Sequence, residues 1–348
     1  MDTEPATHSG SWSSGPDAAT AVMYGLAVTL GAGNFVAVRV SNRELAPFWG
    51  AGLRFGLAAL LFIGIVLVLR LAWPRGRELW LTIWFGVFGF AAFYALMYWA
   101  LTQVEAGLAS VVLAIVPLAT VLMAAAQGLE RLRWRVLLGA LVAGAGILWI
   151  VAGATAVAVP GGALVAMLAA AAVTSESVIL GKKVAGNHPA VTNAVGMLVG
   201  SVLLLAMSLV AGEAWALPNR TDVVVAVTYL VLLGSVGLFA LVLLVVRRWT
   251  ASATSYLFVL FPIVTMVLDT WVADVPLTAR GILGAVVVMV GVWIGALSPG
   301  ARAGAARADA ARADTAGADA MATDRSPVDE PEESPAGGTA TVPPPRAE

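Results

Sequence analysis

Few side chains that could carry out chemistry stand inside the apolar segments of this 348-residue chain. One is Glu176, in the stretch AAAAVTSESVILGKK (169–183), where two serines flank it and Lys182 and Lys183 follow. At a helical rise of about 1.5 Å per residue, Lys182 lies roughly 9 Å away along the axis. Two roles are open for Glu176: it binds a proton or a solute, or it bonds to Lys183 or a serine hydroxyl and stabilises the end of its helix.

Four other polar residues also lie within apolar runs. Arg54 is seven residues into its run, about 10 Å from the end. Its guanidinium could hold an anionic group of a ligand, pair with Asp269 in a later run, or extend to the lipid headgroups. The amides of Asn34 and Asn193 are candidates for hydrogen bonds in an internal cavity, and bonds between helices are the alternative.

Aromatic and proline residues supply a further set of candidates. Tyr94, Tyr98 and Tyr256 could line a cavity and contact an apolar or cationic solute by stacking or cation–π attraction, with helix packing as the alternative. Pro117 and Pro262 occupy matching positions in two runs. Because proline bends a membrane helix and frees carbonyl groups, this pair is a candidate for a hinge or gate, and a fixed kink is the simpler interpretation.

The residue types that are missing exclude several classes of protein. The chain has no cysteine and only two histidines, which excludes thiolate chemistry and leaves too few ligands for a histidine metal site. No GxxxxGK[ST] loop for nucleotide phosphates and no Ser/His/Asp set at catalytic spacing are present. We therefore expect no enzymatic activity, no cofactor, no metal ion and no nucleic-acid partner.

The composition is that of a membrane protein. Charged residues make up 12% of the chain, against about 25% in soluble domains. A membrane helix needs about 20 apolar residues, and ten such runs occur, near 20–40, 47–70, 79–101, 106–127, 135–154, 162–181, 190–211, 223–246, 251–272 and 280–298. The sequence predicts an all-α membrane protein with ten transmembrane helices in the lipid bilayer. A short polar N-terminus (1–19) and a disordered cytoplasmic tail (299–348) flank them.

The positively charged residues predict the orientation of these helices. With the N-terminus inside, the outer loops hold Arg39, Arg43, Arg220 and Arg280. The inner loops hold the larger set: Arg70, Arg75, Arg77, Arg131, Arg133, Arg135, Lys182, Lys183, Arg247 and Arg248. Because cytoplasmic loops of membrane proteins are enriched in lysine and arginine, we expect both termini in the cytoplasm.

The chain repeats itself at a shift of 145 residues. Residues 106–150 align without a gap to 251–295, and the identical pairs include Pro117/Pro262, Arg135/Arg280 and Gly139/Gly284. The same shift superposes Gly89 on Gly234, and a shift of 142 near the N-terminus places Asn34 opposite Glu176. Residues 20–154 and 162–298 are therefore two related halves.

Each half contains five predicted helices, and this odd number determines how the halves relate. The second half enters the membrane from the opposite side, so the halves form inverted repeats about an axis in the membrane plane. Secondary transporters use this architecture to open alternately to each side of the membrane around a central site.

Six stretches of the two halves form a recognisable pattern: LGAGNFVAVRV (30–40), PFWGAGLRFGLAALL (47–61), FGVFGFAAFYALMYWALTQVEAGLASVVLAIVP (85–117), ERLRWRVLLGALVAGAGI (130–147), TASATSYLFVLFPIV (250–264) and LTARGILGAVVVMVGV (277–292). In their order and spacing they resemble the EamA-type family of the drug/metabolite transporter superfamily. The resemblance covers about residues 20–298. It implies a ten-helix carrier, with both ends inside, that moves small metabolites or drugs, often outward.

The second half departs from the family pattern at two places. The family's acid nine residues before the glycine is Glu130 before Gly139, whereas Val275 stands at that distance before Gly284. Arg54 matches the family's arginine in the second span, but Gly196 stands at the equivalent place in the second half. A binding site built from both halves therefore need not be symmetric.

Together these features predict a secondary transporter that exports a small organic solute by alternating access. Proton exchange or the solute's own gradient would drive the export. Two alternatives stay open: a facilitator without ion coupling, and a membrane receptor or scaffold that moves nothing.

Overall fold

A computed structural model describes residues 18–128, 132, 134–152, 159–184, 186–239, 241–242 and 257–297. Every regular element in these residues is a helix. The described residues exclude 1–17 of the predicted N-terminal tail, the whole predicted C-terminal tail, Glu130, Tyr256 and the side chain of Lys182. The expectations made for them stay predictions. Residues 18 and 19, predicted as part of the N-terminal tail, form the start of α1.

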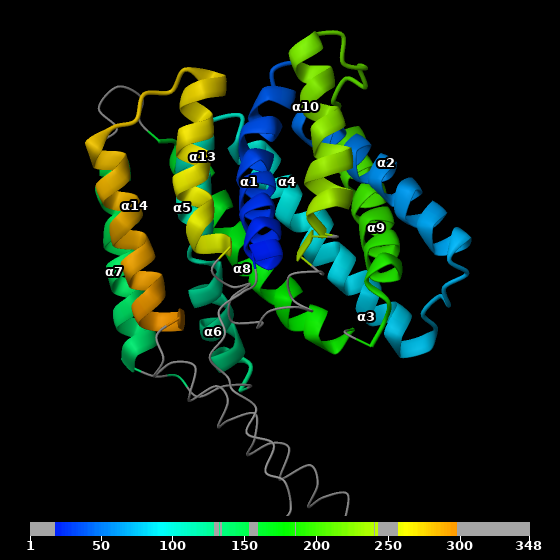
Figure 1. The fold of residues 1–348 in the computed structure, drawn as a ribbon, viewed down its shortest axis with the longest axis horizontal. Helices are drawn as coiled ribbons and strands as arrows, with labels where there is room; N and C mark the ends of the chain where they lie inside the picture. The colour runs from blue at the N-terminus through cyan, green and yellow to red at the C-terminus, as the bar shows by residue number, and fades with distance from the viewer. Residues whose placement is uncertain are drawn as a thin grey trace, which may run out of the picture. The chain divides into compact units, whose positions relative to one another are not determined.

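Ten apolar helical segments follow one another along the chain (Figure 1). The first half comprises α1 (Ala18–Ser41), α2 (Pro47–Val68), α3 (Gly76–Gly86) continued by η1 (Val87–Ala92) and α4 (Phe93–Ala100), α5 (Ala106–Leu113) followed by α6 (Val116–Ala126), and α7 (Trp134–Ala152). The second half comprises α8 (Gly161–Lys183), α9 (Pro189–Val210), α10 (Thr221–Val231) continued by η2 (Leu232–Gly237), α13 (Leu257–Ala273), and α14 (Ala279–Val292) continued by η3 (Trp293–Leu297).

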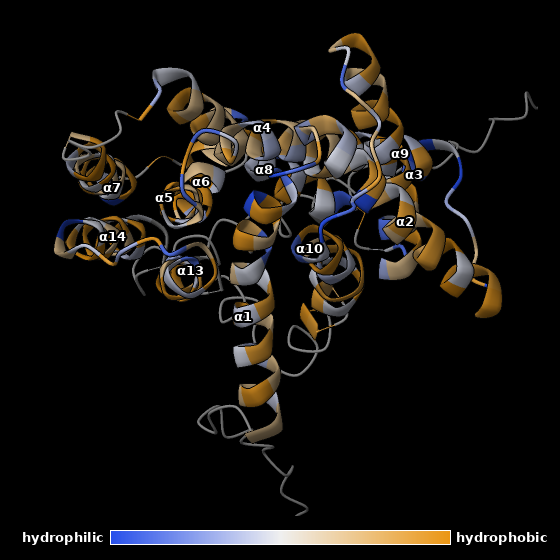
Figure 2. Ribbon diagram, turned by 90° about the horizontal axis from the view of Figure 1, so that it is seen from above, coloured by the Kyte–Doolittle hydropathy of each residue, from blue (hydrophilic) through white to orange (hydrophobic). Residues whose placement is uncertain are grey.

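The lengths and surfaces of these helices suit a lipid bilayer. Seven of the described segments are apolar and at least 18 residues long, and three shorter ones complete the set of ten. Figure 2 shows that hydrophobic residues predominate along the helices, and Leu141 on α7 and Val210 on α9 are 73% and 91% exposed. Large apolar side chains on an outer face find their favourable solvent in the acyl chains of lipids. The predicted all-α membrane fold is confirmed.

Two π-helical turns, η1 and η2, reproduce the sequence repeat in the backbone. Adding 145 to the bounds of η1 (Val87–Ala92) gives the bounds of η2 (Leu232–Gly237). A π-helical turn inserts a residue into the helix, is rare in proteins, and is frequently found at functional sites. Its recurrence at the same place in both halves confirms that the third helix of each half has one origin.

Glycines at the crossing of α7 and α14 also obey the repeat. A Cβ atom added to Gly139 would lie 2.5 Å from the carbonyl oxygen of Gly291, and one added to Gly146 would lie 3.0 Å from that of Gly284. The shift of 145 converts Gly139 into Gly284 and Gly146 into Gly291, so each contact is the image of the other. Small residues of this kind allow two membrane helices to approach closely.

The packing of whole helices follows the same inverted symmetry. α2 packs against its counterpart α9, and α7 packs against its counterpart α14. α1 contacts α13 and α10, while α8 makes the equivalent contacts with α5, α6 and the α3–η1–α4 helix. Each contact recurs with the two halves exchanged, as two inverted five-helix repeats require.

Pro117 and Pro262 are matched in sequence but differ in structure. The helix that contains Pro117 is interrupted at residues 114–115, and α6 restarts with this proline in its first turn. α13 runs through Pro262 without interruption. A proline in the first turn of a helix sacrifices no hydrogen bond, whereas one inside a helix does. The two candidate gating residues therefore do not form a symmetric pair of breaks.

Candidate functional site

Arg54 is one of two charged residues that are almost completely buried in the described part of the bundle. Its side chain on α2 is 1% exposed. Its Nε donates to Ser235 Oγ at 3.1 Å, and its Nη2 donates to the Gly234 carbonyl at 3.2 Å. Both partners lie in the π-helical turn η2, which continues α10. The guanidinium is therefore held by neutral groups of the second repeat and does not extend to the lipid headgroups.

Asn34 on α1 converges on the same turn. Its Nδ2 donates to the Gly234 carbonyl at 3.1 Å, so one carbonyl accepts from both Asn34 and Arg54. Gly234 also packs directly against the Asn34 amide, and a side chain at that position would displace it. The missing side chain of Gly234 thus lets α1 and α10 approach closely enough for this hydrogen bond.

Three aromatic rings surround the Arg54 guanidinium. Its Cζ lies 4.9 Å from the centroid of the Phe55 ring and 5.2 Å from that of Tyr94. The fully buried Tyr98 lies beside it on α4. Aromatic faces attract a guanidinium by cation–π interaction, with about 2 kcal/mol or more available when the pair is desolvated.

Asn34, Arg54, Tyr94, Tyr98 and Ser235 are called here the Arg54 group. Three of its buried polar atoms make no hydrogen bond of good geometry to a described residue: Arg54 Nη1, Asn34 Oδ1 and Tyr98 Oη. The Tyr98 hydroxyl nevertheless lies close enough to Arg54 to interact with its charge. A buried polar group without a partner costs about 1–3 kcal/mol. The Arg54 group therefore has hydrogen-bonding capacity that its described neighbours do not use.

Asp269 pairs with Arg39, so the predicted alternative of an Arg54–Asp269 pair is wrong. Arg39 Nη1 donates to Asp269 Oδ1 at 3.2 Å, and the backbone N–H of Gly107 donates to Asp269 Oδ2 at 3.1 Å. Asp269 is 1% exposed. This one carboxylate joins α1, α5 and α13.

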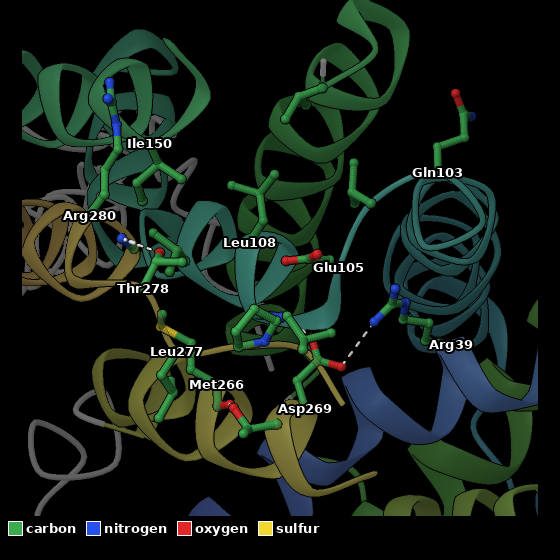
Figure 3. A pocket seen from close by; sticks show the side chains of 18 of the residues that line it. Arg39, Gln103, Glu105, Leu108, Ile150, Met266, Asp269, Leu277, Thr278 and Arg280 are labelled. Atoms are coloured by element: carbon green, nitrogen blue, oxygen red, sulfur yellow. Dashed lines mark hydrogen bonds and ion pairs between the residues drawn. The ribbon is translucent and has the colours of Figure 1, made fainter. Parts of the chain in front are cut away.

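The Arg39–Asp269 pair lies beside a cavity of about 610 Å³ (Figure 3). The cavity is located at the end of the bundle where α1 finishes and α2 begins, which we call the Arg39 end. Its polar lining includes Glu105 and Arg280 in addition to the ion pair. The Arg280 Nε donates to the Trp149 carbonyl at 2.8 Å, and its guanidinium stacks on the Trp149 ring.

Further polar contacts tie the two repeats together at the Arg39 end. Glu213 accepts from the backbone N–H groups of Phe48 and Trp49 at the start of α2. Glu44 accepts in the same way from the backbone of Asn219 and Arg220, just before α10. All three ion pairs in the described part of the chain are at this end: Arg39–Asp269, Arg43–Asp222 and Arg220–Asp222.

Glu176 lies at the opposite end of the bundle from Arg39. It is half-buried on α8, and its Oε2 accepts a hydrogen bond of 2.5 Å from Nε2 of the exposed Gln127. The bond connects α8 to the chain just after α6. Glu176 thus bonds to neither Lys183 nor a serine, which were the predicted structural partners.

The structural counterpart of Asn34 is Ser177 and not Glu176. Gly89 in η1 faces the Ser177 hydroxyl, with 2.5 Å between an added Cβ and Oγ, just as Gly234 in η2 faces the Asn34 amide. The first helices of the two halves are therefore related by a shift of 143, one more than the sequence indicated. One residue corresponds to about 100° around a helix, which turns Glu176 away from the position equivalent to Asn34.

The structure brings only some of the candidate residues together. Asn34, Arg54, Tyr94 and Tyr98 form one group, whereas Asn193 is buried on α9 and has no recorded contact with this group within the described part. Ser235 and Arg39 were not predicted as site residues from the sequence. Ser235 is an ordinary residue in an apolar helix, and Arg39 lies near the end of a span, where a positive charge is unremarkable. The repeat of Gly89 at Gly234 was the one signal that pointed to the η2 turn.

Comparison with known proteins decides the family. The EamA-like transporter family matches residues 19–152 and again residues 160–296, once for each repeat. The chain belongs to this family. It is therefore a multi-pass membrane transporter and not an enzyme, in agreement with the prediction from sequence.

Individual relatives are similar over most of their length. A probable terminal-alkyne amino-acid exporter of Streptantibioticus cattleyicolor is 30% identical over 72% of this chain and 84% of its own. The uncharacterized inner membrane transporter YedA of Escherichia coli K12 is 29% identical over 71% of this chain and 80% of its own. One crystal structure matches with a TM-score of 0.57 at 19% identity, covering 80% of this chain and 96% of that chain. That last likeness concerns the fold alone.

Proposed function

We propose that this EamA transporter exports a small organic solute that bears a carboxylate, such as an apolar amino acid, across the cell membrane. Export proceeds by alternating access between the two inverted repeats. The Arg54 group is the central binding site, and the Arg54 guanidinium holds the carboxylate of the solute.

The observation that carries this proposal is a buried cation with neutral partners only. Moving an arginine to the centre of a membrane helix costs roughly 2.5–3.5 kcal/mol, and the described partners of Arg54 are a hydroxyl and a carbonyl. Neither compensates its charge. A solute carboxylate would do so, and it would engage Nη1, which makes no hydrogen bond of good geometry to a described residue. Arginine binds carboxylates in this two-pronged way in many sites.

The rings beside Arg54 suit the rest of such a solute. Phe55 and Tyr94 pack edge to face with their centroids 4.4 Å apart, and Tyr98 continues the aromatic surface. An apolar side chain would lie against these rings, while the Tyr98 hydroxyl and Asn34 Oδ1 could accept from an ammonium group. The printed name of the Streptantibioticus cattleyicolor relative, an amino-acid exporter, supports the same class of solute.

The proposed outward direction of transport is based on the ion pairs between helices at the Arg39 end. With both termini in the cytoplasm, as the arginine distribution favours, this end faces the outside. Its ion pairs hold the outer ends of the helices together. The described ties at the other end, Gln127–Glu176 and Asn187–Thr82, are not ion pairs. A carrier held together at its outer end loads from the cytoplasm, as export requires.

Proton exchange is the proposed source of energy, with Glu176 as the exchanging carboxylate. It is half-buried within α8 and bonded to a neutral amide. Protonation would abolish its charge and change the tie between α8 and Gln127, so the free energy of the inner contact would depend on the proton.

An efflux experiment tests the proposed direction and solute class. Cells that lack their own amino-acid exporters would express the transporter and grow on a panel of toxic amino-acid analogues, including L-propargylglycine. We expect higher resistance and lower intracellular analogue than in cells that express an Arg54→Gln variant at the same level. Equal accumulation in both strains, with every analogue of the panel, would contradict the proposal.

A further inference from the structure

We propose that the cavity at the Arg39 end is a second solute site, separate from the Arg54 group, that binds a zwitterionic α-amino acid with an apolar side chain. Arg39 binds its carboxylate and Glu105 binds its ammonium group. The inference rests on the proposed export of amino acids. It adds a second binding site, at the outer end, that the solute occupies before it leaves the protein.

The charges that line the cavity are balanced. Two basic residues, Arg39 and Arg280, and two acidic residues, Asp269 and Glu105, are among those that line a volume of about 610 Å³. A site with net charge would favour an ion of the opposite sign, whereas a balanced site with separated charges favours a molecule that carries both. The volume lies within the range of about 300–1,000 Å³ that is typical of sites for small molecules.

Arg39 has hydrogen-bonding capacity left over for a ligand. Its Nη1 donates to Asp269, and no other hydrogen bond of its side chain to a described residue is recorded. The side chain is 31% exposed and lines the cavity. A guanidinium has five N–H donors in a planar fork, so a second carboxylate can bind while the first stays in place.

Asp269 is a positioning residue in this site and not the partner of the ammonium group. Both of its oxygens are occupied, one by Arg39 Nη1 and the other by the Gly107 N–H. The carboxylate is 1% exposed, below the surface that the cavity presents. Its role is to hold the Arg39 guanidinium against the cavity.

Glu105 is the acid that remains for the ammonium group. It stands directly before α5 at the N-cap position, but its side chain makes no capping hydrogen bond. No described residue donates to its carboxylate, and Figure 3 shows the group directed toward the space beside Asp269 and Leu108. An ammonium group here would form a charge-assisted hydrogen bond, about twice as strong as a neutral one.

Apolar residues form the remaining wall. Leu108, Val111, Ile150, Met266 and Leu277 line the cavity between α5, α7, α13 and the start of α14. Methionine, which is unbranched and flexible, adapts to side chains of different shape. The arrangement of one charged side and one apolar side matches an apolar amino acid better than a sugar, which would need hydrogen-bonding partners all round.

Equilibrium binding with three related probes tests the proposal. The full chain carrying Arg54→Gln, which removes the proposed central site, would be placed in nanodiscs of phosphatidylglycerol. The probes are radiolabelled leucine, 4-methylpentanoate, which lacks the ammonium group, and 3-methylbutylamine, which lacks the carboxylate. We expect leucine to bind most tightly of the three.

Substitutions at Glu105 and Arg39 test which side chain binds the ammonium group and which binds the carboxylate of the solute. Glu105→Gln should weaken leucine binding by about tenfold or more, because it removes a charge-assisted hydrogen bond, and should leave 4-methylpentanoate unchanged. Arg39→Gln should weaken both, and Arg39→Lys, which keeps the charge, should restore part of the binding. Glu78→Gln is the matched control, because Glu78 is an exposed acid in the first turn of α3 at the other end of the bundle. Unchanged leucine binding in Glu105→Gln, or equal binding of all three probes, would overturn the proposal.

The headgroup of phosphatidylethanolamine also carries one ammonium group and one anionic group. The binding experiment is therefore repeated in nanodiscs that contain this lipid. Loss of leucine binding when phosphatidylethanolamine is added would assign the cavity to lipid and overturn the proposal. Counterflow of leucine by the unmodified transporter separates this site from the proposed function. If leucine counterflow occurs but Glu105→Gln leaves leucine binding unchanged, only the second site is contradicted. If leucine shows no binding and no counterflow, both the second site and the proposed function are contradicted.

Discussion

Arg39 on α1 and the buried Asp269 on α13 form an ion pair, with 3.2 Å between Nη1 and Oδ1, that the repeat does not reproduce. The shift of 145 residues places Ala124 of α6 where Asp269 would recur. The corresponding pair of helices at the other end, α8 and α6, is tied by Glu176 and Gln127 instead. An ion pair around one buried carboxylate is stronger than a bond between an exposed amide and a half-buried acid. Under the proposed alternating access, the state closed at the Arg39 end is therefore expected to be favoured.

Loss of the ion pair should open the Arg39 end. In Asp269→Asn the charge that holds Arg39 and α1 is removed, and we expect a larger population of the state open at this end. The chain contains no cysteine, so a single Val111→Cys in the buried wall of the cavity can report access to a maleimide reagent. A change of about 1 kcal/mol corresponds to a roughly fivefold faster labelling.

The control for this experiment is Asp222→Asn, which breaks a pair at the same end. Asp222 and its partner Arg43 have side chains 37% and 39% exposed, and such exposed pairs contribute about 0–1 kcal/mol. We expect little change in labelling. If Asp269→Asn labelled no faster than Asp222→Asn, the ion pair would not control this end.

Replacement of Arg54 should abolish transport without unfolding the protein. Arg54→Gln keeps a donor for the Gly234 carbonyl but removes the charge, and we expect the transport rate to fall by about tenfold or more. Arg54→Lys should retain part of the activity, because lysine keeps the charge but lacks the planar fork. Rates would be measured in proteoliposomes and thermal unfolding in detergent. Wild-type transport by Arg54→Gln would rule out Arg54 as the solute anchor.

A side chain at Gly234 should damage the Arg54 group from the opposite side. The Cβ of Gly234→Ala would collide with the Asn34 amide, and overpacking of this kind costs about 1–3 kcal/mol. We expect a lower unfolding temperature and slower transport. Gly144→Ala on α7 is the control, since an added Cβ there meets nothing within 4 Å. Equal unfolding temperatures for the two variants would refute the proposed role of Gly234.

Glu176→Gln tests proton coupling. The amide cannot exchange a proton, but it can still bond to Gln127, so the variant should fold and should transport at a rate that no longer responds to a proton gradient. Transport would be followed with and without an imposed pH gradient. A full response of the variant to the gradient would show that Glu176 is not the coupling group.

The helical architecture could be predicted from the sequence because its determinants are local and periodic. Apolar runs of the right length determine the ten spans, and the odd number of helices per repeat determines the inversion. The glycines of the α7–α14 crossing are among the identical residues of the repeat, Gly139/Gly284 and Gly146/Gly291, so the sequence already contained this contact. The π-helical turns could not be predicted, because one inserted residue leaves no signature in an apolar stretch.

The partners of the polar residues were harder to predict, since they depend on contacts between distant helices. Arg54 and Asp269 are both buried and oppositely charged, yet Arg39 takes Asp269 and the η2 turn takes Arg54. A shift of 142 instead of 143 was enough to place Glu176 rather than Ser177 opposite Asn34. An error of one residue changes the face of a helix, which is why the residues of the candidate site could be named but not assembled.

The central claim is that the chain moves a carboxylate-bearing solute through the Arg54 group, and counterflow in proteoliposomes tests it most directly. Vesicles with the purified transporter would be loaded with unlabelled leucine or other apolar amino acids and diluted into the labelled compound. The account predicts accumulation of label above that in protein-free vesicles, with loss of the effect in Arg54→Gln. No accumulation with any amino acid or carboxylate of a broad panel, by a folded protein, would contradict it.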